Sequence, residues 1–442
     1  MNSREIATKI VDGVLNNGAF SNVILSQELN KSNLEDKDKA LVTEIVYGTI
    51  KYKYTIDKIL NYFLENGFDR LEPQILNILR TAIYQLRYLD KVPEFAVVNE
   101  AVNLAKDLVN IGASKLVNGV LRNYLRNSDD SKFYKKENSV EAICFKYSFP
   151  KWMVELFIYQ YGIDITEKIL IGLNNVPEVT VRVNNLKSTY EEVFKELTDL
   201  GYNLKDGFAS KDAIRILKGR SIEKNPLFIA GKITPQDESA MLVAASMDIK
   251  ENQIVMDLCA APGGKTTHIA EIMRNTGTVK AFDLHDYKIN LVKQNCERLG
   301  VTNVEFMVMD ATSYNTDYLG LADSVLVDVP CSGLGIIRKK PEIKWNKNNL
   351  ETKGLKEIQK KIIINASQYV KTGGVLLYST CTLNKKENEE NIKYFLKKRS
   401  NFKLEPLFFG NLDNIIYSEE GYATILPNEA MDGFFIAKLR KY

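Results

Sequence analysis

The segment MDLCAAPGGKTTHIAEIM, Met256–Met273, places two adjacent glycines between an apolar strand pattern and a helical pattern. A junction of this kind lets backbone amides and a helix N-terminus meet a ligand at the edge of an open α/β sheet. The stretch Gly264–Thr266 matches the end of a P-loop, but Cys259 stands where a P-loop has its first glycine. The dinucleotide pattern G-x-G-x-x-G is missing as well. The loop therefore favours a nucleoside-type ligand with a cationic or zwitterionic tail over a triphosphate.

The residues around this loop predict a doubly wound, mostly parallel sheet. The five strand candidates are QIVMDLCA, TVKAFDL, VEFMVMDA, DSVLVDVP and GGVLLYSTCT. Helical or loop segments separate them, which is typical of βαβ units. We therefore expect residues 234–442 to form a Rossmann-like α/β domain.

Aspartates lie at the ends of the first four predicted strands. A single aspartate there is commonly only a polar cap, but four of them surround the crevice where open α/β sheets bind ligands. An acid-rich crevice suits the positive sulfonium of S-adenosylmethionine. Asp283 follows Gly264 by 19 residues, close to the offset of about 20 expected of a ribose-binding acid. The four aspartates are Asp257, Asp283, Asp310 and Asp328, and the predicted cofactor-binding residues are Cys259, Ala260, Ala261, Pro262, Gly263, Gly264, Lys265, Asp283, Asp310 and Asp328.

The chain has five cysteines, an odd number without a C-x-x-C spacing, which argues against disulfides and a zinc site and fits a reducing cytoplasm. Only two histidines are present, so a histidine-based triad or metal site is implausible and no metal is expected. Packed thiols are the ordinary interpretation of Cys144, Cys259 and Cys296. Cys331 and Cys381 differ, because they follow the apolar parts of the fourth and fifth strands, where a thiolate can be presented. The physical pattern does not rank these two.

The remainder of the chain predicts two further domains. Residues 1–130 show repeated 3.6-residue periodicity and form an all-helical domain whose charges nearly balance. A polar linker is expected over 131–144, followed by a small α+β domain over 145–233. In that domain PEVTVRVN, AIRILKG and PLFIAGKIT read as strands and TYEEVFKELTDLGY as a helix. No apolar run approaches the length of a membrane span, and no secretory signal is visible.

Two sets of motifs resemble known families. VPEFAVVNEAVNLAKDLVN and KLVNGVLRNYLR resemble the helical RNA-binding domain named after the antitermination factor NusB. DLCAAPGGKT, DVPCSGLG and YSTCTL, in this order, resemble the S-adenosylmethionine-dependent RNA cytosine-C5 methyltransferases, and the similarity extends to PQDESAMLVA, RKKPEIKW and EAMDGFFIAKLRK. The combination resembles the bacterial branch that acts on 16S ribosomal RNA, the Sun or Fmu type.

The resemblance implies a covalent mechanism. C5 of cytosine is a poor nucleophile until a thiolate adds to C6, so the reaction needs a nucleophile and a partner that helps release. DNA cytosine-C5 enzymes use a Pro-Cys nucleophile, which would select Cys331. The RNA family uses the Thr-Cys cysteine, which implies that Cys381 is the nucleophile and Cys331 assists release. Asp328 is then expected to hold N3 or the exocyclic amine of the base, with Lys265 supporting the pocket.

The substrate implied is 16S ribosomal RNA, naked or in a partly assembled subunit, with the target base extracted from its stack. A basic run, RKKPEIKWNK, follows a candidate catalytic motif and suggests phosphate contacts beside a stacking tryptophan. The predicted RNA-binding residues are Arg338, Lys339, Lys340, Lys344 and Trp345. We expect a monomer that contacts neither membrane nor metal. Two alternatives stay open: a P-loop nucleotide hydrolase and a non-catalytic RNA-binding factor of the antitermination type.

Overall fold

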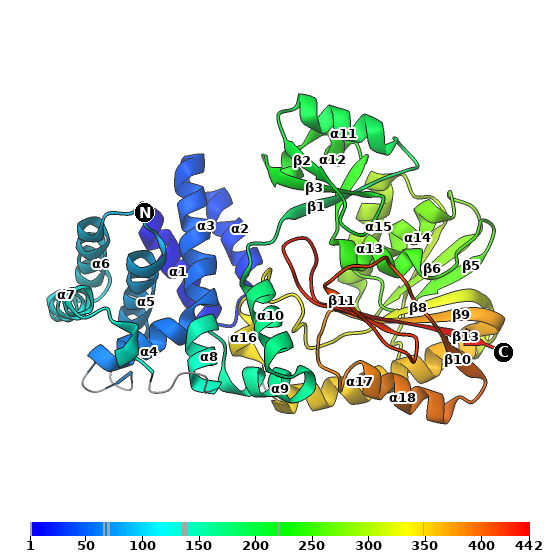
Figure 1. Cartoon of the computed structure of the whole chain (residues 1–442). Coiled ribbons are helices and arrows are strands. Elements are labelled where there is room, and N and C mark those ends of the chain that lie inside the picture. The colour runs from blue at the N-terminus through cyan, green and yellow to red at the C-terminus, as the bar shows by residue number, and fades with distance from the viewer. Residues whose placement is uncertain (1, 65–66, 69–70, 135–139, 220, 348) are drawn as a thin grey trace. The chain divides into compact units, whose positions relative to one another are not determined.

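The computed structural model describes residues 2–64, 67–68, 71–134, 140–219, 221–347 and 349–442. The chain forms two compact units (Figure 1). The helical unit contains Met1–Asn174 and Ile337–Lys347, and the α/β unit contains Asn175–Ile336 and Asn348–Tyr442. No helix of the described residues is long and apolar enough to cross a membrane.

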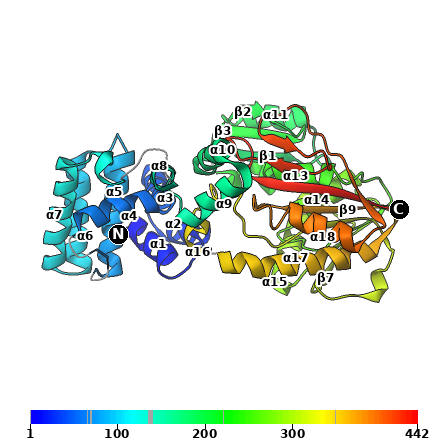
Figure 2. The same cartoon turned by 60° about the horizontal axis from the view of Figure 1, so that its bottom comes forward.

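The helical unit is built from amphipathic helices, which confirms the all-helical prediction for its first 130 residues (Figure 2). Its helices are α1 (Ser3–Leu15), α2 (Ser21–Lys31), α3 (Asp36–Lys51), α4 (Lys53–Phe63), α5 (Pro73–Tyr88), α6 (Glu94–Leu108), α7 (Ile111–Arg126), α8 (Val140–Tyr147), α9 (Lys151–Tyr161), α10 (Ile163–Asn174) and the short α16 (Ile343–Asn346), with a 3-10 turn at Asp130–Lys132. One apolar cluster joins α1, α2 and α3, and a second joins α4 to α8.

The boundary between the units differs from the predicted linker. Residues 135–139 lie outside the described part of the chain, but the rest of the predicted linker beyond them begins helix α8. Ile143 and Cys144 of this helix are buried, and Phe145 joins the apolar cluster of α4 to α7. Helices α9 and α10 also belong to the helical unit, whose first segment ends at Asn174. Local polarity of the sequence did not indicate the helices that follow residue 139.

A small antiparallel sheet with the strand order β2-β3-β1-β4 opens the α/β unit. Its elements are β1 (Val179–Val183), α11 (Tyr190–Asp199), β2 (Asn203–Asp206), β3 (Ala213–Lys218), a 3-10 turn at Ile222–Lys224, α12 (Pro226–Ile229) and β4 (Ile233–Pro235). The predicted strand PLFIAGKIT is wrong in its first half, which forms α12. Asn225 caps this helix by accepting a hydrogen bond from the amide of Leu227, and Pro226 occupies the first turn.

The nine-stranded sheet carries the predicted strands in its centre. The strand order is β11-β12-β13-β9-β8-β5-β6-β7, and β10 also pairs with β13. The five predicted strands, β5 to β9, are parallel, while β10 to β13 add antiparallel pairs. The strands are β5 (Ile254–Asp257), β6 (Thr278–Asp283), β7 (Val304–Val308), β8 (Ala322–Asp328), β9 (Val370–Thr380), β10 (Phe402–Glu405), β11 (Ile415–Tyr417), β12 (Ala423–Ile425) and β13 (Phe434–Lys441).

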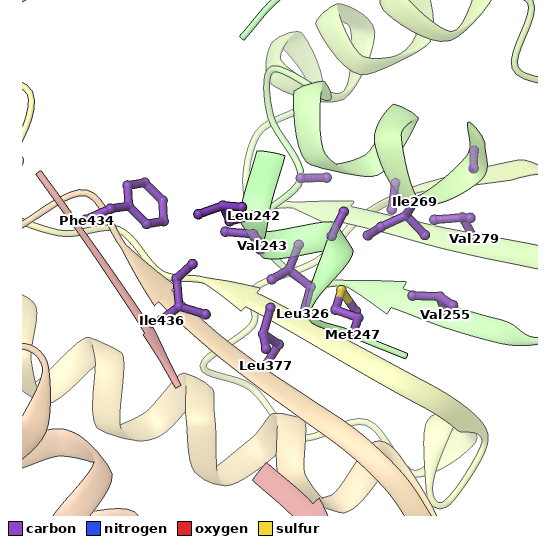
Figure 3. Packing of buried hydrophobic residues seen from close by; sticks show 14 of the residues in the cluster. Leu242, Val243, Met247, Val255, Ile269, Val279, Leu326, Leu377, Phe434 and Ile436 are labelled. Carbon is purple, nitrogen blue, oxygen red and sulfur yellow. The ribbon is translucent and has the colours of Figure 1, made fainter. Parts of the chain in front are cut away.

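Helices cover both faces of this sheet. Successive residues of a strand point to opposite faces, and here the side chains on both faces are apolar and pack against helices. Val255, Leu326 and Leu377 pack against α13 and α14 (Figure 3), whereas their neighbours, such as Leu376, face α17. The covering helices are α13 (Glu238–Ala245), α14 (Gly264–Ile272) and α15 (Asp286–Leu299) on one face and α17 (Asn349–Tyr369) and α18 (Glu389–Lys398) on the other; Thr316–Tyr318 forms a 3-10 turn.

The strand order reverses between β5 and β8, and this position sets the site. The chain runs outward through β5, β6 and β7 and then returns to place β8 beside β5. Open α/β sheets bind ligands at the carboxyl ends of the strands at such a switch point. Asp328 of β8 pairs in register with Ser379 of β9, so the loops that carry the two candidate cysteines leave the sheet side by side.

Candidate active site

The glycine loop is held in place from both ends. Gly263 has a φ of 104° at the start of α14, and a Cβ there would lie 3.1 Å from a methyl group of Val292. Asp257, at the end of β5, is 1% exposed and accepts hydrogen bonds from the Thr266 hydroxyl (2.7 Å) and the Cys259 amide (3.3 Å). Burial raises the pKa of Asp257 to about 6. Asp257 therefore braces the loop from beneath.

The other strand-end acids have different surroundings. Asp283 is nearly buried and accepts hydrogen bonds from the amides of Ala261 (3.3 Å) and Leu284 (2.8 Å), so the end of β6 contacts the glycine loop. Asp310 is exposed, and hydrogen bonds from the hydroxyl and amide of Thr312 lower its pKa. Asp283 thus lies against the loop, whereas Asp310 mainly fixes its own turn.

A lysine, an aspartate and a serine meet above β5 and β8. The Lys265 ammonium lies 2.6 Å from one Asp328 oxygen, and the Ser379 hydroxyl donates to the other at 2.7 Å. Burial alone lowers the pKa of Lys265, but the charge and hydrogen bond of Asp328 outweigh it, and the pKa lies above its ordinary value. A thiolate at Cys381 would raise the pKa of Lys265 in the same direction.

The two cysteines singled out in the sequence are in direct contact. The Sγ atoms of Cys331 and Cys381 are 3.3 Å apart, and both residues are half-buried. The hydrogen bond with Cys381, together with burial, raises the pKa of Cys331 well above its ordinary value. Cys331 is therefore a protonated thiol at neutral pH. The other three cysteines lie elsewhere: Cys144 and Cys296 are buried, and Cys259 lies in the glycine loop.

A buried glutamate that sequence reasoning missed fixes both cysteine loops. Glu387 is fully buried, and its carboxylate accepts hydrogen bonds from the amide (2.9 Å) and hydroxyl (2.6 Å) of Ser332, the residue after Cys331. The Ser332 hydroxyl is also 2.8 Å from that of Thr382, which follows Cys381. Gln359 and Asn384 donate to the same carboxylate. The acid- and amide-rich run NKKENEEN directly after YSTCTL was the available signal.

Glycine is required where these two loops cross. The Gly335 amide donates to the carbonyl of Cys381 (2.9 Å), and the Gly335 carbonyl accepts from the amide of Gly433 (2.9 Å). A Cβ on Gly335 would overlap with the carbonyl of Gly433. The last glycine of DVPCSGLG therefore permits a close backbone approach that holds Cys381 in register.

The predicted RNA-contact run does not form a solvent-facing basic surface. Arg338 and Lys344 are only 2% and 1% exposed. The Lys344 ammonium donates to the carbonyls of Lys51 (3.1 Å) and Ser148 (3.0 Å) and to the side-chain oxygen of Asn174 (2.9 Å).

Trp345 is likewise part of the helical core. Its indole N–H donates to the carbonyl of Ile50 at 2.7 Å, and its ring packs on the cluster of α1 to α3. Lys339 and Lys340 are half-buried. The prediction that Arg338 and Lys344 contact RNA is contradicted by their burial, and the Trp345 ring already packs against the apolar cluster of α1 to α3, whereas RNA contact by Lys339 and Lys340 stays a prediction.

The site as a whole defines a class of protein. A parallel sheet with a reversal at β5 and β8, a two-glycine loop and carboxylates at successive strand ends make this a Rossmann-like α/β domain of the methyltransferase type. Within the described residues no group of three His, Cys, Asp or Glu side chains is arranged to hold a metal ion.

Family models match along the chain. Residues 244–440 match 16S rRNA methyltransferase RsmB/F, residues 1–126 match the NusB family, and residues 149–223 match the ferredoxin-like domain of RsmF/B-like methyltransferases. The probable ribosomal RNA small subunit methyltransferase B of Bacillus subtilis (strain 168) is 37% identical over 99% of this chain and 98% of its own length. This chain belongs to the RsmB/F family of 16S rRNA methyltransferases.

Solved structures agree with this assignment. The crystal structure of PH0851 has a TM-score of 0.83 at 28% identity and covers 100% of this chain and 99% of that one. The structure of NSun6 from Pyrococcus horikoshii with SFG has a TM-score of 0.59 at 26% identity, covering 67% of this chain and 99% of that one. The fold is therefore shared with these two structures over all and about two thirds of this chain, respectively.

Proposed function

We propose that this protein methylates C5 of a cytosine in 16S ribosomal RNA, with S-adenosylmethionine as the methyl donor and a covalent bond between Cys381 and C6 as the intermediate. The contact of 3.3 Å between Cys331 and Cys381, beside the Lys265–Asp328 pair, carries this proposal. We further propose that the protein acts as a monomer in the cytoplasm, the compartment expected of this substrate.

The glycine loop and the acids around it fit the proposed cofactor. S-adenosylmethionine supplies an electrophilic methyl group on a positive sulfonium. Around Gly264 the loop is open, since a Cβ added at this glycine would lie 3.9 Å from the nearest side-chain atom, on Gln236. Asp283 has its oxygens at the mouth of the loop and is assigned to the ribose hydroxyls. The other contacts with S-adenosylmethionine are assigned to the loop from Cys259 to Lys265. Asp310 and Asp328 supply negative charge that favours its positive sulfonium.

The two cysteines are assigned different roles because their surroundings differ. The raised pKa of Cys331 keeps it protonated, and Lys265 contributes positive charge near Cys381. This arrangement supports Cys381 as the thiolate that attacks C6 of the ring, which makes C5 nucleophilic. In release, a solvent water accepts the C5 proton, the electron pair of the broken C5–H bond forms the C5–C6 double bond, and the C6–S bond breaks so that Cys381 departs as a thiolate. Cys331 donates its S–H to that departing thiolate.

Asp328 is assigned to the exocyclic amine of the cytosine. An ionised carboxylate only accepts hydrogen bonds, so it fits the N–H of the amine better than the lone pair of N3. Ser379 and Lys265 each occupy one of its oxygens, which fixes the plane of the carboxylate. Lys265 then supports the pocket rather than transferring a proton, because its pKa is raised.

Equilibrium binding tests the cofactor half of the proposal. S-adenosylmethionine should bind the wild-type protein, while ATP with magnesium should not, since Cys259 replaces the first glycine of a phosphate nest. Asp283→Ala should weaken binding by about 1.5–3 kcal/mol, the worth of hydrogen bonds to a charged acceptor. Asp286→Ala, an exposed acid three residues away, is the matched control. Tight ATP binding without binding of the methyl donor would instead support the nucleotide-hydrolase alternative.

Product mapping tests the reaction itself. A 16S ribosomal RNA transcript and partly assembled small subunits, each incubated with the protein and S-adenosylmethionine, should acquire 5-methylcytosine at a defined position. Omitting the methyl donor is the control, and comparing the two substrates shows which form is used. RNA binding without any transfer would favour a non-catalytic antitermination-type factor, and methylation at another atom would reject the C5 assignment.

A further inference from the structure

The helical unit carries a groove between α6 and α7 that lies outside the site described above. These two helices run side by side in both views (Figures 1 and 2). The groove has a volume of about 680 Å³. Phe95 on α6 lines it and is 78% exposed, although it is a large aromatic ring. Side-chain amides of Asn99 and Asn118 face the same space.

Positive charge gathers in this groove although the N-terminal region as a whole is nearly neutral. Helix α7 contains Lys115, Arg122 and Arg126 and no aspartate or glutamate, and all three cations line the groove with a single carboxylate, Glu94. Among the described residues no ion pair joins any of these three cations to an acid. The Arg122 Nε–H donates to Asn118 at 2.9 Å, which leaves its terminal N–H groups available.

The spacing of the cations fits an extended anionic chain. Lys115, Arg122 and Arg126 lie within about 40° of one another on the helix surface and span about 16 Å along its axis. A row of cations of this length suits consecutive phosphates of one nucleic-acid strand. An exposed aromatic ring beside such a row can stack on an unpaired base, and side-chain amides can form hydrogen bonds with the edges of the bases.

We propose that the groove between α6 and α7 binds single-stranded RNA. Lys115, Arg122 and Arg126 contact phosphates, and Phe95 stacks on a base. The proposal rests on the proposed function, since it names the surface of the helical unit that holds the same RNA substrate. It offers an exposed alternative to the run Arg338–Trp345, in which Arg338 and Lys344 are buried. An acidic protein partner would also meet the cations, but it would not explain the stacking ring flanked by amides.

The charge-removing variant Lys115→Gln/Arg122→Gln/Arg126→Gln tests the phosphate contacts in the full-length protein. Its affinity for a 16S ribosomal RNA transcript and for an unstructured 20-nucleotide RNA should fall by about 10-fold to 100-fold at moderate salt. The slope of log affinity against log salt should decrease by about 2, because each phosphate contact on a single strand contributes about 0.7. Deleting the helical unit is not a usable test, because residues 337–347 pack with it.

Two further variants separate the contributions. Phe95→Ala should weaken RNA binding about 10-fold while the salt slope stays unchanged, because stacking releases no counterions. Lys31→Gln/Lys37→Gln/Lys168→Gln removes the same charge from exposed positions on α2, α3 and α10 and should bind RNA nearly as well as wild type. All variants should melt like wild type and bind S-adenosylmethionine equally.

The outcomes distinguish this proposal from the proposed function. If the groove triple variant binds RNA with the affinity and salt slope of the control triple variant, the groove is not the RNA site, even where wild type methylates the transcript. If wild type binds RNA through the groove but transfers no methyl group, the proposed function is wrong, while the assignment of the groove as an RNA-binding site is still supported. Loss of self-association or of a protein partner, with RNA binding intact, would overturn the proposal.

Discussion

Cys381→Ala is expected to abolish RNA methylation and to form no covalent complex, whereas Cys331→Ala is expected to accumulate a protein–RNA adduct that survives denaturing electrophoresis. The two sulfurs are 3.3 Å apart, so a single base can meet both, but only one can bond to C6. Without Cys381 no thioether forms and C5 stays unreactive. Without Cys331 the attack proceeds, but the departing thiolate loses its hydrogen-bond donor and release slows.

The expected effects are large. Loss of the nucleophile should reduce turnover on the order of 10⁴-fold or more, as for nucleophiles in other covalent enzymes. Loss of the hydrogen-bond donor that assists departure should slow release by about 10-fold to 150-fold, the worth of about 1.5–3 kcal/mol for a hydrogen bond to a charged group. Labelled RNA on a denaturing gel measures the adduct, and mass spectrometry of the crosslinked peptide identifies the cysteine.

Cys296→Ala is the matched control. Cys296 is buried on α15, so its truncation removes packing and lowers stability while activity persists in the folded fraction. An adduct in Cys381→Ala and none in Cys331→Ala would mean that Cys331 is the nucleophile and Cys381 assists release, as expected from the Pro-Cys nucleophile of DNA cytosine-C5 enzymes. Full activity in both variants would remove cysteines from the mechanism.

The parts of the fold and site that follow local patterns could be predicted from the sequence. The strands β5 to β9 are continuous apolar runs, and parallel strands buried on both faces produce such runs. The order of strand ends then places Lys265, Asp328, Cys331 and Cys381 at one edge. The contact between the two sulfurs nevertheless depends on register, which the sequence does not state. The raised pKa of Cys331 likewise follows from that geometry.

The parts that depend on distant contacts could not be predicted. Strands β11 and β12 are only three residues long. They form because β13, which pairs with β9, offers its other edge to β12, and β12 in turn pairs with β11. Lys344 reads as a surface charge until the carbonyls of Lys51 and Ser148 enclose it. Glu387 reads as one of several acids in a solvated run until the Ser332 loop reaches it from 55 residues away. In each case the deciding partner lies far along the chain.

A second large effect is expected at Arg182, which joins the small sheet to the glycine loop. Its side chain is fully buried on β1 and donates to both carboxylate oxygens of Glu271 on α14, at 3.0 and 2.7 Å. It also donates to the carbonyl of Gly264 (2.8 Å), to Thr267 and to Gln236. One guanidinium therefore fixes the first turn of the helix that follows the proposed cofactor loop.

Arg182→Met should lower the free energy of unfolding by about 3–5 kcal/mol, because it leaves the Glu271 carboxylate buried and unpaired. Arg182→Met/Glu271→Met should recover most of that loss, since replacing both members of a buried pair with apolar groups is often neutral. Denaturant unfolding of the single and double variants, followed by circular dichroism, gives the coupling energy. Lys232→Met is the control: its pair with Glu196 is partly exposed and should contribute no more than about 1 kcal/mol.

The same variants separate stability from positioning at the glycine loop. In the double variant the carbonyl of Gly264 still lacks its donor, so the first turn of α14 is less firmly held although the unpaired charge is gone. We therefore expect its stability to return toward wild type while its affinity for S-adenosylmethionine stays several-fold weaker. Equal recovery of both properties would mean that Arg182 stabilises the unit without ordering the loop. A loss of less than about 1 kcal/mol in Arg182→Met would contradict the buried-pair argument itself.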